Sequence, residues 1–566
     1  MSSYINLLLA MDTLIAENFI YEQTLDKTVP DSDRVVFKQK NITPIIDNAR
    51  GGSEYISGKV VIDAQNFGNG PEIPDWANAY VVFPEVEKLT GQAGNADMTV
   101  AALPTNFLTA PKNNALVESF RAEQGGNMVV SESQNLSQLV NFKKHCTTSA
   151  DDIAKNAATT LYAPDGVGNW AATASIAGVS NVGNNPNGTV LTGAEQFNAG
   201  VLQRQRAGLP LNAVSTVFND ATKQANEFAP YQKITSAVTT IATASATTLS
   251  EIHRARVVYL RDLDDYFAKH PLVRGCGYKF TFTVNQGSAV ATYSSITTTQ
   301  FATLPTLTAA TLTGPATCMP SMLVVGPNTV AGAGATTIGT TSSLTLTLSS
   351  KLDISSDARQ QGVMLYVPTY IPTEEYEARL LQSPQVYRTP FKITSSVFTG
   401  LTANAPINLQ LFTAIANPRA LVVIPQFAQE TQTQPSQCSP LNPSPACTDP
   451  TLSLTKCQIR VNARPVLPAP QSYGFQQFIE NTSRIFAVNG GLSPITSGVI
   501  DFWKFMHNYR YYAFDLSYLA EEQRDIPQLV SFESFNNNSV KIDLYVYCLS
   551  EQGAIFDMVK GGVELK

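Results

Sequence analysis

Charged residues are scarce in this chain of 566 residues, where Asp, Glu, Lys and Arg together make up 15% of the sequence. An average soluble domain has roughly 25%. The chain carries 38 Lys and Arg against 45 Asp and Glu, a formal net charge of −7, and has no basic tail. Proteins that hold nucleic acid tightly need a basic surface to neutralise phosphates, so direct sequence-specific nucleic-acid binding is not expected.

Long apolar runs are absent as well. No stretch reaches the roughly 18 to 20 apolar residues that a membrane-spanning helix requires. The run that begins at Ile5 stops at Asp12 and has no basic segment before it, so no signal peptide is predicted. Apolar residues recur on one helical face from Ile5 to Phe19, which predicts an N-terminal helix within residues 1–25. This helix either packs on the body or forms an arm that reaches a neighbouring subunit; a membrane contact is also open.

The residue types of metal and nucleophile chemistry are few and scattered. No two of the seven cysteines form a CxxC pair, and no histidine stands at zinc-ligand spacing from any of them. Neither an HExxH nor a GxSxG segment occurs. The sequence therefore predicts no enzyme, no catalytic residue, no cofactor and no metal site. Cys438 and Cys447 share a Pro-rich loop, where they either bridge or stay free, as in a reducing compartment.

One carboxylate cluster is dense enough to be considered for chemistry. Asp262, Asp264 and Asp265 stand within four positions, but the glycine and terminal glutamate of a calcium loop are missing. Charge runs usually lie on solvated faces, so we interpret these residues as the solvated face of a helix.

Strand patterns dominate what is present. Apolar and polar residues alternate along several segments, and period-two alternation indicates a strand with one buried face. Many such strands separated by Gly, Pro and Asn turns predict a sandwich or barrel. The clearest examples are Tyr278–Val284, Leu344–Leu348, Ile407–Leu411 and Ile542–Val546.

Two short phrases occur twice, in the same order. Ala79–Pro84 (AYVVFP) is echoed by Ala420–Pro425 (ALVVIP), and Leu365–Val367 (LYV) by Leu544–Val546 (LYV). This predicts two copies of one β-rich unit. The landmarks lie much farther apart in the first copy, so we expect the first copy to carry the large inserted loops, where added length costs little.

Helical patterns are few. Ile252, Leu260, Leu263 and Phe267 fall on one face, which predicts a helix from Ser250 to Phe267 that leads into the strand at Tyr278. A second helix is predicted from Val499 to His507, followed by a strand at Tyr511–Leu516. We interpret the two helix-then-strand pairs as equivalent parts of the two copies.

A neutral segment separates Lys279 from Lys351, with no charged residue between them. It is rich in Thr, Ser, Ala and Gly but also holds apolar residues, among them Phe301 and Leu304. Disordered segments usually carry charge, so residues 286–350 are interpreted as an ordered β-rich insertion. The alternative is an exposed flexible loop.

Several phrases resemble one family. Val363–Arg379, which contains VPTYIPTEEYEAR, resembles the connector between the barrels of double jelly-roll major capsid proteins, most closely those of polinton-like viruses and virophages. Tyr259–Leu272, Ala416–Val423 and Asn538–Gly561 are similar to a helix, a second-barrel strand phrase and the closing strands of that family.

The resemblance implies an all-β fold of two eight-stranded jelly-roll barrels in tandem, with large loop insertions and a few short helices. The limits would be an arm at 1–25, a first barrel at 26–372, a linker at 373–385 and a second barrel at 386–566. It implies a homotrimeric, pseudo-hexameric capsomer of the icosahedral shell of a DNA virus, located in the virion. Its partners would be neighbouring capsomers, penton proteins and minor or cement proteins. The alternatives are a viral fibre or cell-surface adhesin and a jelly-roll carbohydrate-active protein.

Overall fold

The computed structural model describes most of residues 36–94, 107–164, 240–296, 306–313, 320–325, 342–352, 363–371, 384–428, 452–486, 498–516 and 526–565, with short gaps, together with 98–99, 204 and 233–234. The predicted helix in residues 1–25, the loop with Cys438 and Cys447, and nearly all of the predicted linker lie outside the described residues. The domain limits at 26–372 and 386–566 stay predictions.

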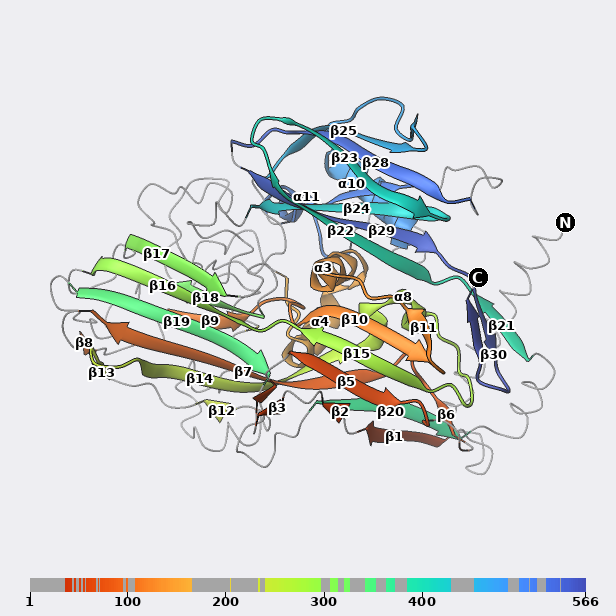
Figure 1. The fold of residues 1–566 in the computed structure, drawn as a ribbon, viewed down its shortest axis with the longest axis horizontal. Helices are drawn as coiled ribbons and strands as arrows, with labels where there is room; N and C mark the ends of the chain where they lie inside the picture. The colour runs from red at the N-terminus through yellow and green to blue at the C-terminus, as the bar shows by residue number, and fades with distance from the viewer. Residues whose placement is uncertain are drawn as a thin grey trace.

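The first barrel consists of two antiparallel sheets (Figure 1). When its eight strands are counted along the chain, one sheet has the order 1, 8, 3, 6 and the other has the order 2, 7, 4, 5. The first sheet contains β1 (Val36–Ile42), β20 (Met364–Ile371), β7 (Tyr80–Ala93) and β14 (Thr247–Tyr259), and the second contains β5 (Lys59–Ala64), β15 (Tyr278–Val284), β10 (Val117–Gln124) and β11 (Asn127–Val130).

The second barrel repeats the same strand order. Strands 1, 8, 3 and 6 again form one sheet, and 2, 7, 4 and 5 the other. This order defines a jelly roll, so the chain has a double jelly-roll fold, and the predicted fold class is confirmed. The sheets are β22 (Phe391–Leu401), β29 (Ile542–Glu551), β24 (Pro418–Phe427) and β27 (Tyr512–Asp515), and β23 (Pro406–Ile415), β28 (Gln528–Asn536), β25 (Leu454–Val461) and β26 (Arg464–Pro465).

The repeated phrases occupy equivalent strands. In the first barrel they lie on strands 3 and 8, which pair so that Tyr80 opposes Tyr366 and Val81 opposes Leu365. In the second barrel strands 3 and 8 pair likewise, with Val423 opposite Val546. Central strands buried on both faces read as nearly continuous apolar runs, which explains why these strands preserve a visible echo.

The helix predicted from Ser250 to Phe267 is wrong over its first half. Residues up to Tyr259 belong to β14, which pairs with β7 along most of its length. Only α7 (Leu260–Leu263) and α8 (Asp265–Ala268) are helical. Ile252, Arg254 and Arg256 alternate into the barrel interior, and this strand pairing overrides the helical spacing of the apolar residues.

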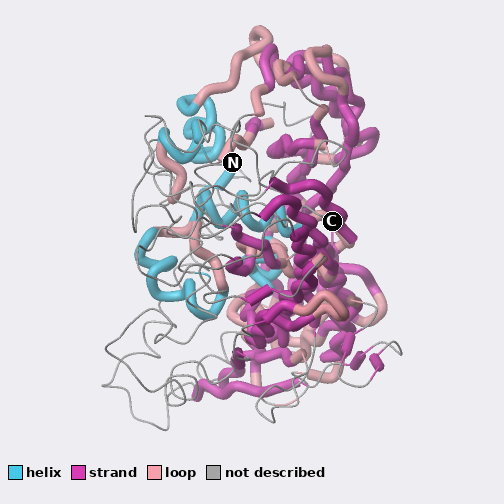
Figure 2. Tube along the Cα trace, turned by 90° about the vertical axis from the view of Figure 1, so that its left-hand side faces the viewer, coloured by secondary structure: helices cyan, strands magenta, loops and turns pink. Residues whose placement is uncertain are grey.

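The proposed equivalence of the two helices is also wrong. α11 (Phe502–His507) precedes strand 6 of its barrel, whereas α7 and α8 follow strand 6 of theirs. Among the described residues, the helices between strands 5 and 6 are α3 (Leu136–Thr147) and α4 (Ala150–Thr160) in the first barrel, and α10 (Phe475–Phe486) and α11 in the second. Figure 2 shows the described helices gathered on one side of the strands.

The neutral segment contributes four strands between strands 7 and 8 of the first barrel: β16 (Gly287–Ile296), β17 (Thr306–Thr313), β18 (Ser321–Val325) and β19 (Ser342–Leu352). β19 pairs with the far half of β7, and β16 and β17 continue that sheet outward (Figure 1). β18 pairs with β9 (Phe107–Pro111) instead. No helix among the described residues is long and apolar enough to cross a membrane.

Candidate functional site: the junction between the two barrels

The two barrels meet where helices of the first face a sheet of the second (Figure 1). Gln134, just before α3, donates its backbone N–H to Ser395 Oγ on β22 at 3.1 Å. Tyr547 on β29 donates its hydroxyl to the Asn135 carbonyl at 2.7 Å. These bonds join the start of α3 to two adjacent strands of the second barrel, the edge strand β22 and the central strand β29, and so they fix its position on that sheet.

α8 makes a second set of ties, to the first residues of the second barrel. Asp265 accepts the backbone N–H of Phe391 at 3.0 Å and pairs with Lys269 at 2.9 Å. Lys269 in turn donates to the Thr389 carbonyl at 2.9 Å and lies 4.6 Å from the centre of the Phe391 ring. One short helix thus anchors the point at which the chain enters the second barrel.

His145 lies at the centre of a buried contact between α3 and the segment before strand 6 of the second barrel. Its Nδ1 is 3.0 Å from the Tyr511 hydroxyl, and its ring lies 4.2 Å from that of Tyr509. Burial lowers the pKa of His145 to about 3, with smaller contributions from Lys504 and Arg204. The imidazole is therefore neutral at physiological pH and acts as a packing and hydrogen-bonding group.

A glycine permits this contact. The backbone N–H of Val499 donates to the His145 carbonyl at 2.9 Å. The preceding Gly498 has φ of +65°, and a Cβ there would overlap the carbonyls of His145 and Cys146. Only glycine combines that backbone conformation with so close an approach.

The C-terminal residues return to the first barrel as a hairpin. β30 (Ala554–Asp557) and β31 (Val563–Leu565) form a small sheet with β21 (Gln385–Arg388). The buried Phe556 ring lies 4.9 Å from His270 and 5.6 Å from Tyr266. At the hairpin turn, Gln124 Nε2 donates to the Gly561 carbonyl at 2.6 Å. The end of the second barrel is thereby clamped to the first.

A cysteine and a histidine lie beneath this clamp, close enough to be considered as a catalytic pair. Cys276 Sγ is 3.7 Å from His270 Nε2, and the Tyr278 hydroxyl lies 2.7 Å from that nitrogen. Burial raises the pKa of Cys276 to about 12 and lowers that of His270 to about 3. A reactive cysteine needs the thiolate, which a positive neighbour stabilises. Here both groups are neutral, so this is a packed polar cluster and not a nucleophilic site.

The carboxylate cluster at 262–265 is not a solvated face, and that interpretation is corrected. Asp262 pairs with Lys144 at 2.6 Å, and Asp265 ties α8 to the second barrel. Asp264 is buried and accepts the backbone N–H of Tyr266 at 2.9 Å as the N-cap of α8. Burial raises the pKa of Asp264 to about 7 despite that hydrogen bond. The two helices observed here, α7 and α8, have four residues each and pack against neighbouring elements, so they have no extended solvated face.

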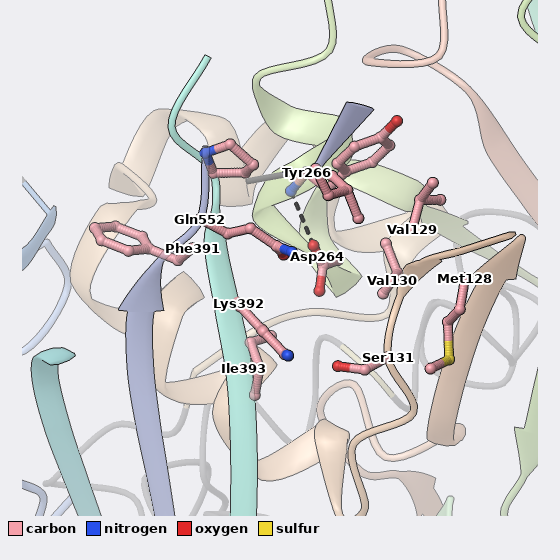
Figure 3. A pocket seen from close by; sticks show the side chains of 12 residues that line it. Met128, Val129, Val130, Ser131, Asp264, Tyr266, Phe391, Lys392, Ile393 and Gln552 are labelled. Atoms are coloured by element: carbon pink, nitrogen blue, oxygen red, sulfur yellow. Dashed lines mark hydrogen bonds between the residues drawn. The ribbon is translucent and has the colours of Figure 1, made fainter. Parts of the chain in front are cut away.

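Two clefts flank Phe391 at the junction. The smaller, of about 70 Å³, lies between β11 and the start of β22, with Asp264, Lys392 and Ser131 on its walls (Figure 3). The larger, of about 320 Å³, lies between α3, α7 and α8 on one side and β22 and β29 on the other. Both clefts are therefore bounded by residues of both barrels.

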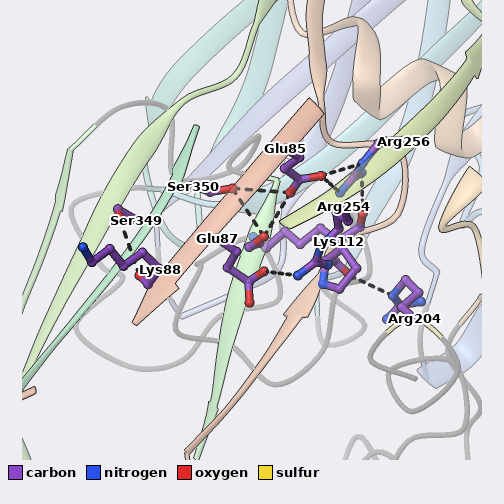
Figure 4. Close-up of polar contacts among 11 residues, drawn as sticks. Glu85, Glu87, Lys88, Lys112, Arg204, Arg254, Arg256, Ser349 and Ser350 are labelled. Carbon is purple, nitrogen blue, oxygen red and sulfur yellow. Dashed lines mark hydrogen bonds and ion pairs between the residues drawn. The ribbon is translucent and has the colours of Figure 1, made fainter. Parts of the chain in front are cut away.

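A buried ionic layer lies where the neutral insertion meets the first barrel (Figure 4). Arg254 pairs with Glu87 at 2.9 Å and Arg256 with Glu85 at 2.8 Å, and all four side chains are at most 1% exposed. The other oxygen of Glu85 accepts from Ser321 at 3.3 Å. Removing one partner of a buried pair leaves an uncompensated charge and costs about 3–5 kcal/mol. The layer thus fixes the register between β7 and β14 below the insertion.

The remaining residues considered for chemistry are the possible metal ligands and the cysteines. Among the described residues no group of three or more His, Cys, Asp and Glu side chains is placed to hold a metal ion. Cys146, Cys276, Cys457 and Cys548 are buried and free. The side chains of His253 and His507 lie outside the described residues. Sequence reasoning missed the junction, because its members come from segments as far apart as Gln124 and Gly561, and no local pattern connects them.

A scan against protein-family models and a search of curated proteins each find no match. Among solved structures, the chain is similar to one from the Sputnik virophage (TM-score 0.47, 11% identity, 95% of this chain and 89% of that chain). It is also similar to the mavirus major capsid protein (0.46, 11%, 96% and 93%) and to a chain of the PBCV-1 virus capsid (0.38, 9%, 96% and 99%). The fold assignment rests on the strand order of this chain and not on these distant likenesses.

Proposed function

We propose that this double jelly-roll protein is a viral major capsid protein, and that three copies form a pseudo-hexameric capsomer of an icosahedral shell. The observation that carries the proposal is the repeat itself: two barrels of identical strand order, joined through a buried junction. Three two-barrel subunits around a threefold axis present six similar barrels, and closed cyclic symmetry is usual for homo-oligomers. The family resemblance of the connector and closing strands supports the same assembly.

The junction supports this role because a six-barrel tile requires a constant angle between barrels. Independent domains joined by a linker move relative to one another by default. Here the α3 contacts, the α8 ties and the C-terminal hairpin oppose such motion at three places. In this proposal the first barrel spans 26–372 and the second 386–566. The C-terminal hairpin belongs to the second barrel by sequence but packs against the first.

The insertion indicates that the two barrels have different roles in the shell. β16, β17 and β19 extend one sheet beyond the first barrel, and no comparable extension is described on the second. Low charge suits repeated contact between copies, because the cores of interfaces are depleted in charged residues. We place this extension on the outer surface of the shell, and neighbouring capsomers, penton proteins and minor or cement proteins around it.

The proposal involves no catalysis, and locates the protein in the virion. The neutral Cys276 and His270 pair and the structural use of Asp262 to Asp265 are consistent with an architectural protein. A jelly-roll carbohydrate-active protein would need a carboxylate pair beside an open cleft. We expect a glycan-hydrolysis screen of the purified chain to show no activity.

The oligomeric state tests the proposal directly. Size-exclusion chromatography with light scattering on the purified chain is expected to give three times the 61.1 kDa subunit mass, or larger assemblies of that unit. A protein that stays monomeric even at high protein concentration would contradict the proposal. A regular elongated fibre would favour the fibre alternative.

A further inference from the structure

The larger cleft at the junction is lined by more apolar than polar side chains. Leu139, Val140, Leu263 and Leu549 on its walls are each 4% exposed. Phe391, Ile393 and Ile485 complete the apolar lining. Three elements of the first barrel and three of the second therefore converge on one apolar space.

The size of this space is that of a small-molecule site. The cleft measures about 320 Å³. Small-molecule sites are typically 300 to 1,000 Å³ and lie preferentially at domain interfaces. Apolar cavities exclude water and take up apolar ligands. The apolar part of the lining is aliphatic except for Phe391, so it suits an alkyl chain better than a planar ring.

The charged residues beside the cleft indicate which polar group of a ligand could bind there. Lys144 is matched by Asp262 at 2.6 Å, and Lys269 by Asp265 at 2.9 Å. Lys143 lies one helical position away and donates only to the Arg261 carbonyl, at 3.2 Å, with no carboxylate of the described residues within ion-pair distance. Its ammonium has two further donor sites. Lys143, which itself lines the cleft, is therefore the one of these three lysines without a salt bridge, and the buried Asp264 is the carboxyl group that interacts with it electrostatically.

We propose that this cleft binds a free fatty acid, with the alkyl chain between the helices and the β22 sheet and the carboxylate on Lys143. The occupant would contact both barrels at once and so stabilise the junction by mass action. The proposal rests on the junction and not on the capsid role, and it stands if the chain serves another assembly.

Dodecanoate, titrated below its critical micelle concentration into the full-length protein, is the probe. Isothermal titration calorimetry is expected to show binding of one equivalent, and dodecyltrimethylammonium, which has the same chain and the opposite charge, to bind far more weakly. Lys143→Gln is expected to raise the dissociation constant for dodecanoate about tenfold, since hydrogen bonds to charged groups contribute about that factor. Lys155→Gln on α4, whose side chain is 68% exposed and remote from the cleft, is the matched control and should leave it unchanged.

A second variant tests the part of the cleft that would hold the alkyl chain. Ile393→Phe enlarges the wall contributed by β22 and is expected to weaken dodecanoate binding while the melting temperature shows that the fold is kept. Three results would overturn the proposal: no binding of dodecanoate, equal binding of the cationic surfactant, or an affinity unaffected by Lys143→Gln. If Ile393→Phe does not fold, Lys143→Gln and the surfactant comparison still decide the question.

Discussion

Burial sets the protonation of the residues that join the barrels. His145 and His270 have their pKa values lowered to about 3, and Asp264 has its pKa raised to about 7, in each case mainly by loss of solvent. The folded state therefore holds all three close to neutrality near pH 6. Packing of neutral groups, with a few hydrogen bonds, accounts for the contact better than attraction between charges.

Acid should loosen the protein through the two histidines. The pKa of each histidine in the folded state lies below the ordinary value of 6.5. Their contribution to the free energy of unfolding is therefore complete above pH 6.5 and is lost as the pH falls toward 3. Each contributes a slope of about 1.4 kcal/mol per pH unit in that window. Asp264 has the opposite sign, since its raised pKa costs stability as the pH rises from about 4 to 7, and it offsets one histidine.

Asp264→Asn removes that offset and keeps the helix cap. Urea unfolding between pH 6.5 and 4.5 is expected to show a steeper loss of stability in this variant, approaching twice the wild-type slope. Asp151→Asn, at an exposed position of α4, is the control. Equal slopes in Asp264→Asn and the wild type would contradict a protonated Asp264 in the folded protein.

Gly498 is the most constrained single position at the junction. Gly498→Ala adds both the cost of positive φ and the overlap with the His145 and Cys146 carbonyls, so we expect a loss of more than about 2 kcal/mol. Gly125→Ala is matched in backbone conformation, with φ of +55° and nothing near the added Cβ, and should cost about 1 kcal/mol. Denaturant titration measures both, and equal losses would contradict the close contact at Gly498.

At the scale of elements, the sequence predicted the strands well and the helices poorly. The alternating segments at Tyr278, Leu344, Ile407 and Ile542 are strands β15, β19, β23 and β29. Alternation depends only on neighbours two positions apart. It matches one buried face in β15 and β19, whereas β29 is buried on both faces. The pattern misleads at β14 because Arg254 and Arg256 are inward-facing charges, acceptable only opposite Glu85 and Glu87 on a strand distant in sequence.

The C-terminal hairpin makes a testable contribution as an element. Phe556→Ala empties its position between Tyr266 and His270, and a buried Phe→Ala change costs about 3–5 kcal/mol. Hydrogen exchange is expected to report faster opening of α8 in this variant. Val559→Ala, in the same hairpin but 45% exposed, should change stability by less than about 0.5 kcal/mol. Unchanged protection of α8 in Phe556→Ala would show that the hairpin does not clamp the barrels.

At the scale of the whole molecule, the duplication is visible in sequence but the junction is not. The echoes survive because strands 3 and 8 lie at the centre of each sheet, where apolar residues are required on both faces. The contacts between barrels consist of single hydrogen bonds, one glycine and the packing of His145 and Phe556, none of which leaves a periodic trace. The result is one two-barrel body whose first half carries the sheet extension.

Cryo-electron microscopy of the assembled protein tests the central claim most directly. The account predicts capsomers with three copies of the chain, six barrels in a pseudo-hexagonal ring, and three protrusions formed by the extension built from β16, β17 and β19. Particles in which the chain is monomeric, or in which the two barrels of one chain take variable relative positions, would contradict it.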